Sequence, residues 1–211
     1  MRPHIAPFAA ALALTAILAT PATATSATDC FAENYELRIL GCTEMLKGAL
    51  SPQERAVAFA SRALALSMKG WYAEAIKDYD RSLANDPTQP VALNNRAWAY
   101  FRWGKPTEGI EDIEKSLRLD ANSGASWDTR AHINQATGKA AQALADYRKA
   151  IIFGSTRMTK MYQCGLTEHG LYKGPMDGVP NPELHDALGK CVLDTTCDPL
   201  PADEECRHGT S

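Results

Sequence analysis

The chain has 211 residues, of which 45% are hydrophobic, and it carries a formal net charge of -3. This length and this hydrophobic fraction indicate a globular protein with a core of its own, and they argue against an intrinsically disordered chain. The nearly balanced charges provide no basic surface for nucleic acid or for an anionic membrane, so neither partner is predicted.

The first 27 residues have the pattern of a secretory signal peptide. A weakly positive start at Arg2 precedes a mostly apolar run at Ile5–Ala19, and small residues follow Pro21. The pattern predicts cleavage after Ala24 or Ala27, and the alternative is an uncleaved N-terminal anchor. We therefore expect a periplasmic or secreted protein that has no membrane attachment once the signal peptide is removed.

Residues 28–55 are expected to contain a capping helix. Apolar residues recur at roughly helical spacing between Phe31 and Leu46. The stretch Ser51-Pro-Gln-Glu54 then predicts a new helix, with serine at the N-cap, proline at the first position and glutamate at the third. Because stacked repeats need terminal caps, we expect this segment to cover the open face of the first repeat that follows.

Residues 56–157 contain three copies of one unit. Gly70, Gly104 and Gly138 are 34 residues apart, and seven further columns of residues keep the same period. The period and the residue types resemble the tetratricopeptide repeat (TPR). This resemblance implies two antiparallel helices per repeat, packed through small residues such as Ala63 and Ala75, with repeats near 56–89, 90–123 and 124–157.

The predicted fold class is therefore all-α. We expect a short TPR helical-hairpin solenoid of three repeats, with an N-terminal capping helix and a small disulfide-braced helical module at the C-terminal end.

An arginine and an aspartate recur together in every repeat. Each arginine stands where the TPR pattern more often has leucine, and an aspartate follows it sixteen residues later. One interpretation is a ladder of arginines that binds an acidic ligand. An ion pair that joins the two helices of each repeat is favoured, because both partners recur together and an arginine fork matches a carboxylate. The predicted pairs are Arg62–Asp78, Arg96–Asp112 and Arg130–Asp146.

The resemblance also implies a concave face on which proteins of this kind bind peptides. Aromatic residues and arginine dominate binding hot spots, and the second repeat supplies both types to this face. The alternative is that Trp98 and Phe101 pack against a neighbouring helix. The lysine and asparagine clamp of some relatives is absent, since Ala60 and Leu64 stand where it would begin. The predicted partner-binding residues are Asn94, Trp98, Phe101, Arg102, Asp128 and His132.

Residues 158–211 form a different unit, in which a glycine- and proline-rich stretch, Gly170–Pro182, separates two predicted helices. This stretch resembles the turn of the helical peptidoglycan-binding-like module of bacterial envelope proteins. The matching residues are Leu166, Gly170, Tyr172, Gly174, Met176, Asp177, Gly178, Ala187 and Leu188. The resemblance implies Tyr172, Lys173 and Asp177 as candidate glycan contacts. The alternative is a module that serves as a spacer or docking surface.

All six cysteines lie beyond the predicted cleavage sites, and an exported chain meets an oxidising compartment, so we expect disulfide bonds. Proximity along the chain favours three pairs, Cys30–Cys42, Cys164–Cys191 and Cys197–Cys206, while other pairings stay open. The first pair requires the cap to bend near Asn34, because twelve residues of straight helix would separate its cysteines by about 18 Å. A metal site with His169, His185 or His208 competes, but no CxxC pair or HxxxH spacing supports one.

No motif places a serine or cysteine nucleophile beside a base, and no motif indicates a cofactor. We therefore predict a non-enzymatic exported scaffold or adaptor that binds a protein or peptide partner in the cell envelope through its concave face. Two alternatives stay open. One is an accessory subunit of a cell-wall enzyme that contacts peptidoglycan through the C-terminal module, and the other is a secreted effector that binds host proteins.

Overall fold

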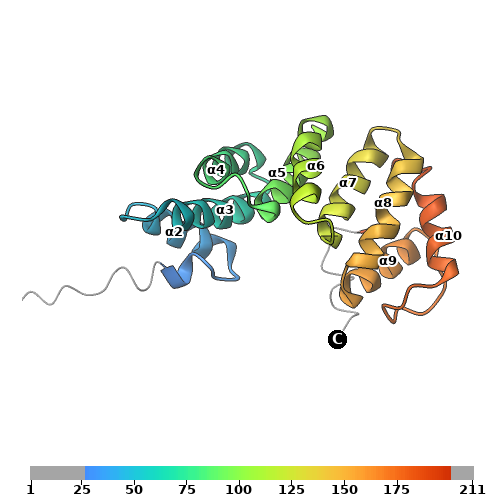
Figure 1. Cartoon of the computed structure of the whole chain (residues 1–211). Coiled ribbons are helices and arrows are strands. Elements are labelled where there is room, and N and C mark those ends of the chain that lie inside the picture. The colour runs from blue at the N-terminus through green and yellow to red at the C-terminus, as the bar shows by residue number, and fades with distance from the viewer. Residues whose placement is uncertain (1–26, 201–211) are drawn as a thin grey trace, which may run out of the picture.

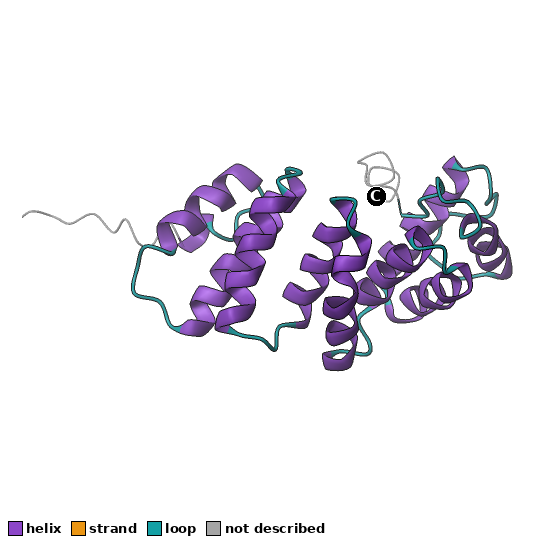
Figure 2. Cartoon of the chain, turned by 90° about the horizontal axis from the view of Figure 1, so that it is seen from above, coloured by secondary structure: helices purple, strands orange, loops and turns teal. Residues whose placement is uncertain are grey.

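The computed structural model describes residues 27–200, and every regular element in this range is helical (Figure 2). The predicted signal peptide up to residue 26, Cys206 and His208 lie outside the described residues. The helices follow one another in a row from the N-terminal end to the C-terminal end (Figure 1). Their bounds are α2 Tyr35–Met45, α3 Pro52–Met68, α4 Tyr72–Asn85, α5 Pro90–Arg102, η1 Pro106–Gly109, α6 Ile110–Leu119, α7 Gly124–Ala136, α8 Ala140–Phe153, α9 Thr156–Glu168 and α10 Pro182–Cys191.

Three helical hairpins form the repeats, as the 34-residue period predicts. They are α3 with α4, α5 with η1 and α6, and α7 with α8. A glycine with a positive φ lies two residues after the end of the first helix of each hairpin, and φ is 77° at Gly70 and 76° at both Gly104 and Gly138. This left-handed conformation favours glycine because it has no Cβ. The predicted all-α solenoid with its cap and C-terminal module is confirmed.

The second hairpin departs from the simple pattern of two α-helices. A 3₁₀ turn that begins at Pro106 leads into α6, where the other repeats begin their second α-helix directly. The two helices of this hairpin approach closely at Gly109, where an added Cβ would come within 2.9 Å of the Ala97 Cα atom. A glycine therefore takes the place of the alanine that the neighbouring repeats have at this position.

The N-terminal cap is closed by its own disulfide and is joined to the first repeat by polar contacts. Cys30 and Cys42 form a disulfide with their Cα atoms 4.3 Å apart, and the chain turns before α2, whose N-cap is Asn34. This pair and the bend near Asn34 agree with the prediction. The Ser61 hydroxyl donates a hydrogen bond of 2.6 Å to the Cys30 carbonyl, so the cap is tied to α3.

The three Arg–Asp pairs are present and join the two helices of each hairpin. The guanidinium Nε donates to the aspartate at 2.6 Å in Arg62–Asp78 and Arg96–Asp112, and at 2.8 Å in Arg130–Asp146. A second guanidinium nitrogen donates to the other carboxylate oxygen in all three pairs. The aspartates are buried, so these arginines are engaged within the fold rather than presented to a ligand.

The C-terminal module shares one apolar core with the third repeat. Tyr147 on α8 belongs to the same buried cluster as Tyr162 on α9 and Leu184 and Leu188 on α10. The module therefore continues the stack of helices instead of forming a separate body, which is consistent with its place in Figure 1.

The predicted disulfides of this module are wrong. Cys191 bonds Cys197, so Cys191 does not pair with Cys164, and Cys197 does not pair with Cys206. Helix α10 ends at Cys191, and the chain then turns tightly enough to bring the two Cα atoms to 5.3 Å, within the normal range for a disulfide. Cys164 is also disulfide-bonded.

Candidate binding site on the concave face

Helices α5 and α7 bring most of the predicted partner-binding residues together. Residues three and four apart on a helix share a face, and α5 presents Trp98, Phe101 and Arg102 in this way. The Trp98 ring centroid lies 5.0 Å from that of Phe101 and 5.2 Å from that of His132 on α7. Trp98 and Phe101 are partly buried by these contacts, so the packing role and the surface role coexist in the same side chains.

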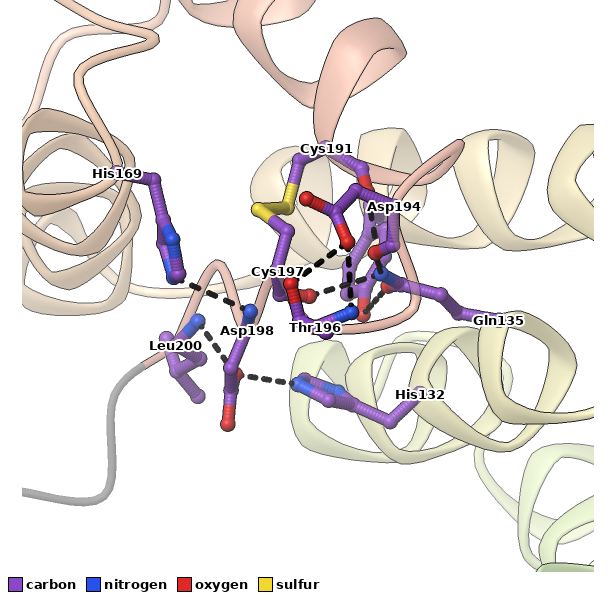
Figure 3. The surroundings of a disulfide bond; sticks show 10 residues. His132, Gln135, His169, Cys191, Asp194, Thr196, Cys197, Asp198 and Leu200 are labelled. Carbon is purple, nitrogen blue, oxygen red and sulfur yellow. Dashed lines mark hydrogen bonds and ion pairs between the residues drawn. A yellow bond between two sulfur atoms is a disulfide. The ribbon is translucent and has the colours of Figure 1, made fainter.

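The chain's own C-terminal segment covers the half of this face that belongs to the third repeat. We call residues 192–200 the strap, and the half beneath it, which contains Asp128, His132 and Gln135, the closed half. Gln135 Nε2 lies 3.2, 3.0 and 2.8 Å from the carbonyl oxygens of Cys191, Asp194 and Cys197 and donates to them (Figure 3). The strap is thus bound largely through its main chain.

A buried histidine forms the second attachment of the strap. His132 Nε2 lies 3.1 Å from Asp198 Oδ1 of the strap (Figure 3). His132 Nδ1 lies 2.9 Å from the main-chain oxygen of Asp128. His132 is only 4% exposed and Asp128 only 5%. Both were predicted to contact a partner, but the strap and α9 close them to external molecules in this structure.

The closed half holds a charged histidine between two carboxylates. Burial by itself would lower the pKa of His132, but the adjacent Asp128 and Asp198 carboxylates raise it to about 9. Burial raises the pKa of Asp128, although His132 and the hydroxyl of Tyr162, which donates to Asp128, act in the opposite direction. At neutral pH the imidazolium therefore binds the strap as one member of an ion pair.

The half of the face that belongs to repeats one and two is open. We call this half of the face the open half, and it contains a pocket of about 140 Å³. Its lining residues are Leu64, Ser67, Met68, Tyr72, Tyr79, Asn95, Trp98 and Arg102. Of the predicted partner-binding residues, Trp98 and Arg102 line this pocket, while Phe101 lies beside the strap in a neighbouring hollow.

Among residues 27–200, two hydroxyls in the open half have no hydrogen-bond partner. The side chain of Tyr79 is fully buried, and its hydroxyl lies beside Ser67 and Asn95 without a hydrogen bond of acceptable geometry to either. The Ser67 hydroxyl is buried and unpaired as well. Asn94 donates to the Asn95 side chain at 3.1 Å, while its own side-chain oxygen has no partner. Unpaired buried polar groups are costly in a folded protein, so they call for an explanation.

Tyr79 and Asn95 were not predicted as site residues. Tyr79 belongs to a column that recurs every 34 residues, together with Ile113 and Tyr147. One signal in the sequence could have identified Tyr79. A tyrosine at a buried position carries a hydroxyl group, and a buried hydroxyl usually forms a hydrogen bond.

The loop of the C-terminal module does not present its predicted glycan-contact tyrosine. Tyr172 is 1% exposed, and its hydroxyl donates to the Pro175 carbonyl at 2.9 Å and accepts from Asn181 at 2.9 Å. Asp177 accepts from the Val179 main-chain nitrogen at 2.8 Å, so it shapes the turn. Lys173 is exposed. The residues of the motif therefore build the loop, and the fold closes Tyr172 to a glycan.

Between residues 27 and 200, no cluster of three or more His, Cys, Asp or Glu side chains is arranged to hold a metal ion. Within the same range, no helix combines the length and the apolar character needed to cross a membrane.

Comparison with known proteins supports the repeat assignment. Residues 78–111 match a family model described as tetratricopeptide repeat, and this range includes most of α4, all of α5 and the start of α6. Repeats of this type are in general protein–protein interaction modules. A search of curated proteins found no match.

Proposed function

We propose that the protein is a non-enzymatic scaffold or adaptor that binds a peptide segment of a partner protein in the open half of its concave face. The supporting observation is the pair of buried, unpaired hydroxyls of Ser67 and Tyr79 in the wall of the pocket. A bound peptide would supply the missing hydrogen-bond partners, and the free protein tolerates the cost of leaving them unpaired.

The surface around these hydroxyls also suits a peptide. Trp98 and Tyr72 supply aromatic area, and Arg102 lies over the Trp98 ring with its Cζ atom 5.7 Å from the ring centroid. Aromatic residues and arginine provide much of the affinity at protein interfaces. Among the described residues, the strap covers the closed half and none covers the open half, so the open half is the part we assign to such a partner.

The proposed setting is the cell envelope or the extracellular medium. The Cys30–Cys42 and Cys191–Cys197 disulfides are consistent with an oxidising compartment. The adaptor function is preferred to glycan binding through the C-terminal module, since Tyr172, one of the three candidate glycan contacts, is buried.

The test is partner capture by crosslinking in cells, followed by affinity purification and mass spectrometry. The Trp98→Ala/Arg102→Ala double variant is expected to lose the captured partners while its helical circular dichroism stays unchanged. The matched control is Trp103→Ala/Lys105→Ala, which removes another stacked aromatic–cation pair, 3.5 Å from nitrogen to ring centroid, outside the pocket. Equal capture by both double variants would place the binding site elsewhere.

A further inference from the structure

We infer that the open half recognises an acidic peptide segment, holding a main-chain carbonyl through Ser67 and Tyr79 and a carboxylate through Arg102. This inference rests on the proposed function and specifies its ligand. The reasoning starts from the closed half, where the same molecule already holds a peptide segment of its own.

The third repeat shows how this fold binds a main chain. The Tyr147 hydroxyl donates to Gln135 Oε1 at 2.8 Å, and this bond orients the Gln135 amide so that Nε2 faces the carbonyl oxygens of the strap. Both side chains are buried, so the donor group is fixed before the strap is bound. A pre-positioned donor loses little conformational entropy when it binds an acceptor.

The first repeat has polar side chains at the same two positions. Ser67 and Tyr79 precede Gln135 and Tyr147 by two repeat periods of 34 residues. Both hydroxyls are buried in the pocket wall, and neither has a hydrogen-bond partner in the part of the chain that the structure describes. The repeat symmetry therefore places a second set of donors where a second peptide main chain would lie, and the Tyr79 and Ser67 hydroxyls can each donate to a carbonyl.

The charge of the open half selects an acidic ligand. Among the described residues that line the pocket, Arg102 is the only charged one. Its side chain is exposed, so it is available to a ligand at the rim. The strap carries its own carboxylate, Asp198. Burial acts to raise the pKa of this group, but His132 lowers it and the positive charge of Arg102 adds to the lowering. A peptide with an aspartate or glutamate would repeat this arrangement, and an arginine fork matches a carboxylate in shape.

The pocket volume limits what enters it. A volume of about 140 Å³ corresponds to only a few water molecules at roughly 30 Å³ each, so it accepts no more than one short side chain or a single peptide group. The rest of the peptide would lie along the exposed rim near Trp98 and Arg102.

The experiment presents the purified full-length protein with a randomised pool of eight-residue peptides, acetylated at the N-terminus and amidated at the C-terminus. Retained peptides are sequenced by mass spectrometry. We expect aspartate and glutamate to be enriched at least about fivefold at one position. Arg102→Ala should abolish this enrichment, and Arg102→Glu should replace it with enrichment of lysine and arginine. Arg118→Ala, which removes an exposed arginine outside the pocket, should leave the enrichment unchanged.

A second pool with free C-termini identifies the source of the carboxylate. Acidic enrichment in the amidated pool indicates a side chain, whereas retention confined to the free-acid pool indicates a terminal carboxylate. For the best retained peptide, Tyr79→Phe should weaken binding about fivefold, because one hydrogen bond of about 1 kcal/mol is lost and 1.4 kcal/mol corresponds to tenfold.

The outcomes separate this inference from the proposed function. If peptides are retained without acidic enrichment, or if Arg102→Ala leaves the enrichment intact, the inference is wrong while the adaptor function stands. If no peptide of either pool is retained, and the Trp98→Ala/Arg102→Ala variant captures the same partners in cells as the wild type, both the inference and the proposed function are wrong.

Discussion

Tyr79 and Tyr147 occupy the same position in repeats one and three, and each can be changed to phenylalanine with the loss of only one oxygen atom. Both side chains are fully buried. The Tyr147 hydroxyl donates to Gln135 Oε1 at 2.8 Å, whereas the Tyr79 hydroxyl has no partner. Two chemically identical substitutions therefore have different expected effects on the free energy of unfolding.

The magnitudes follow from the hydrogen bonds. Tyr147→Phe removes one bond and leaves the buried Gln135 oxygen unsatisfied, so we expect a loss of about 1–3 kcal/mol. Tyr79→Phe removes a hydroxyl that is unpaired in the free protein, so we expect a change within about 0.5 kcal/mol of zero, or a small stabilisation. The packing of the rings is retained in both variants, because only the hydroxyl oxygen is removed.

The assay is urea unfolding followed by far-ultraviolet circular dichroism, with the midpoint and slope compared among the wild type and the two variants. Hydrogen exchange with mass spectrometry supplies a local measurement: in Tyr147→Phe, exchange should be faster in the strap, because Gln135 is no longer oriented toward the strap carbonyls. Equal losses of stability in both variants, or a larger loss in Tyr79→Phe, would refute the assignment of paired and unpaired hydroxyls.

Three further predictions concern stability. Arg96→Ala should destabilise the array by roughly 1–3 kcal/mol in urea unfolding, because it leaves the buried Asp112 without its arginine. A urea midpoint equal to that of the wild type would contradict a stabilising pair. The pKa of His132 is raised to about 9 in the folded state, so the contribution of this side chain to stability should be complete below its ordinary pKa near 6.5 and lost as pH rises through about 9. In unfolding measured between pH 6 and 10, His132→Gln should show a smaller loss of stability with rising pH than the wild type. An identical pH profile in the two proteins would contradict the ion pair. Replacing Cys191 and Cys197 by serine should accelerate hydrogen exchange in the strap while the three hairpins keep their protection, and non-reducing peptide mapping of the wild type should recover these two cysteines in one linked peptide.

Most of the repeat architecture could be predicted from the sequence, because its determinants recur at a fixed spacing. The glycines at the end of the first helices, the small residues where the helices of a hairpin meet and the Arg–Asp pairs all follow the 34-residue period. Each of these features acts within one hairpin or between neighbouring hairpins, so its partner lies at a predictable distance along the chain. The Ser51 capping box is equally local, since its two hydrogen bonds join residues three apart.

The candidate site could be predicted only in part. Trp98 and Arg102, which the repeat register assigned to the concave face, line one pocket, and this arrangement follows from helical spacing. The register also placed Asp128 and His132 on this face, but their accessibility depends on what packs over them. Burial is a property of the assembled chain, so a residue can occupy the expected position and still be closed to a partner.

The sequence by itself thus determined the helical hairpins, their number and the ion pairs within them, and it favoured the Cys30–Cys42 disulfide within the cap. Only the tertiary structure decided that the strap covers the third repeat and that Cys191 bonds Cys197. The physical reason lies in what Gln135 recognises. It binds three main-chain carbonyls that are 56, 59 and 62 residues away. Every residue has such a carbonyl, so this contact leaves no pattern of side chains in the sequence from which it could be predicted.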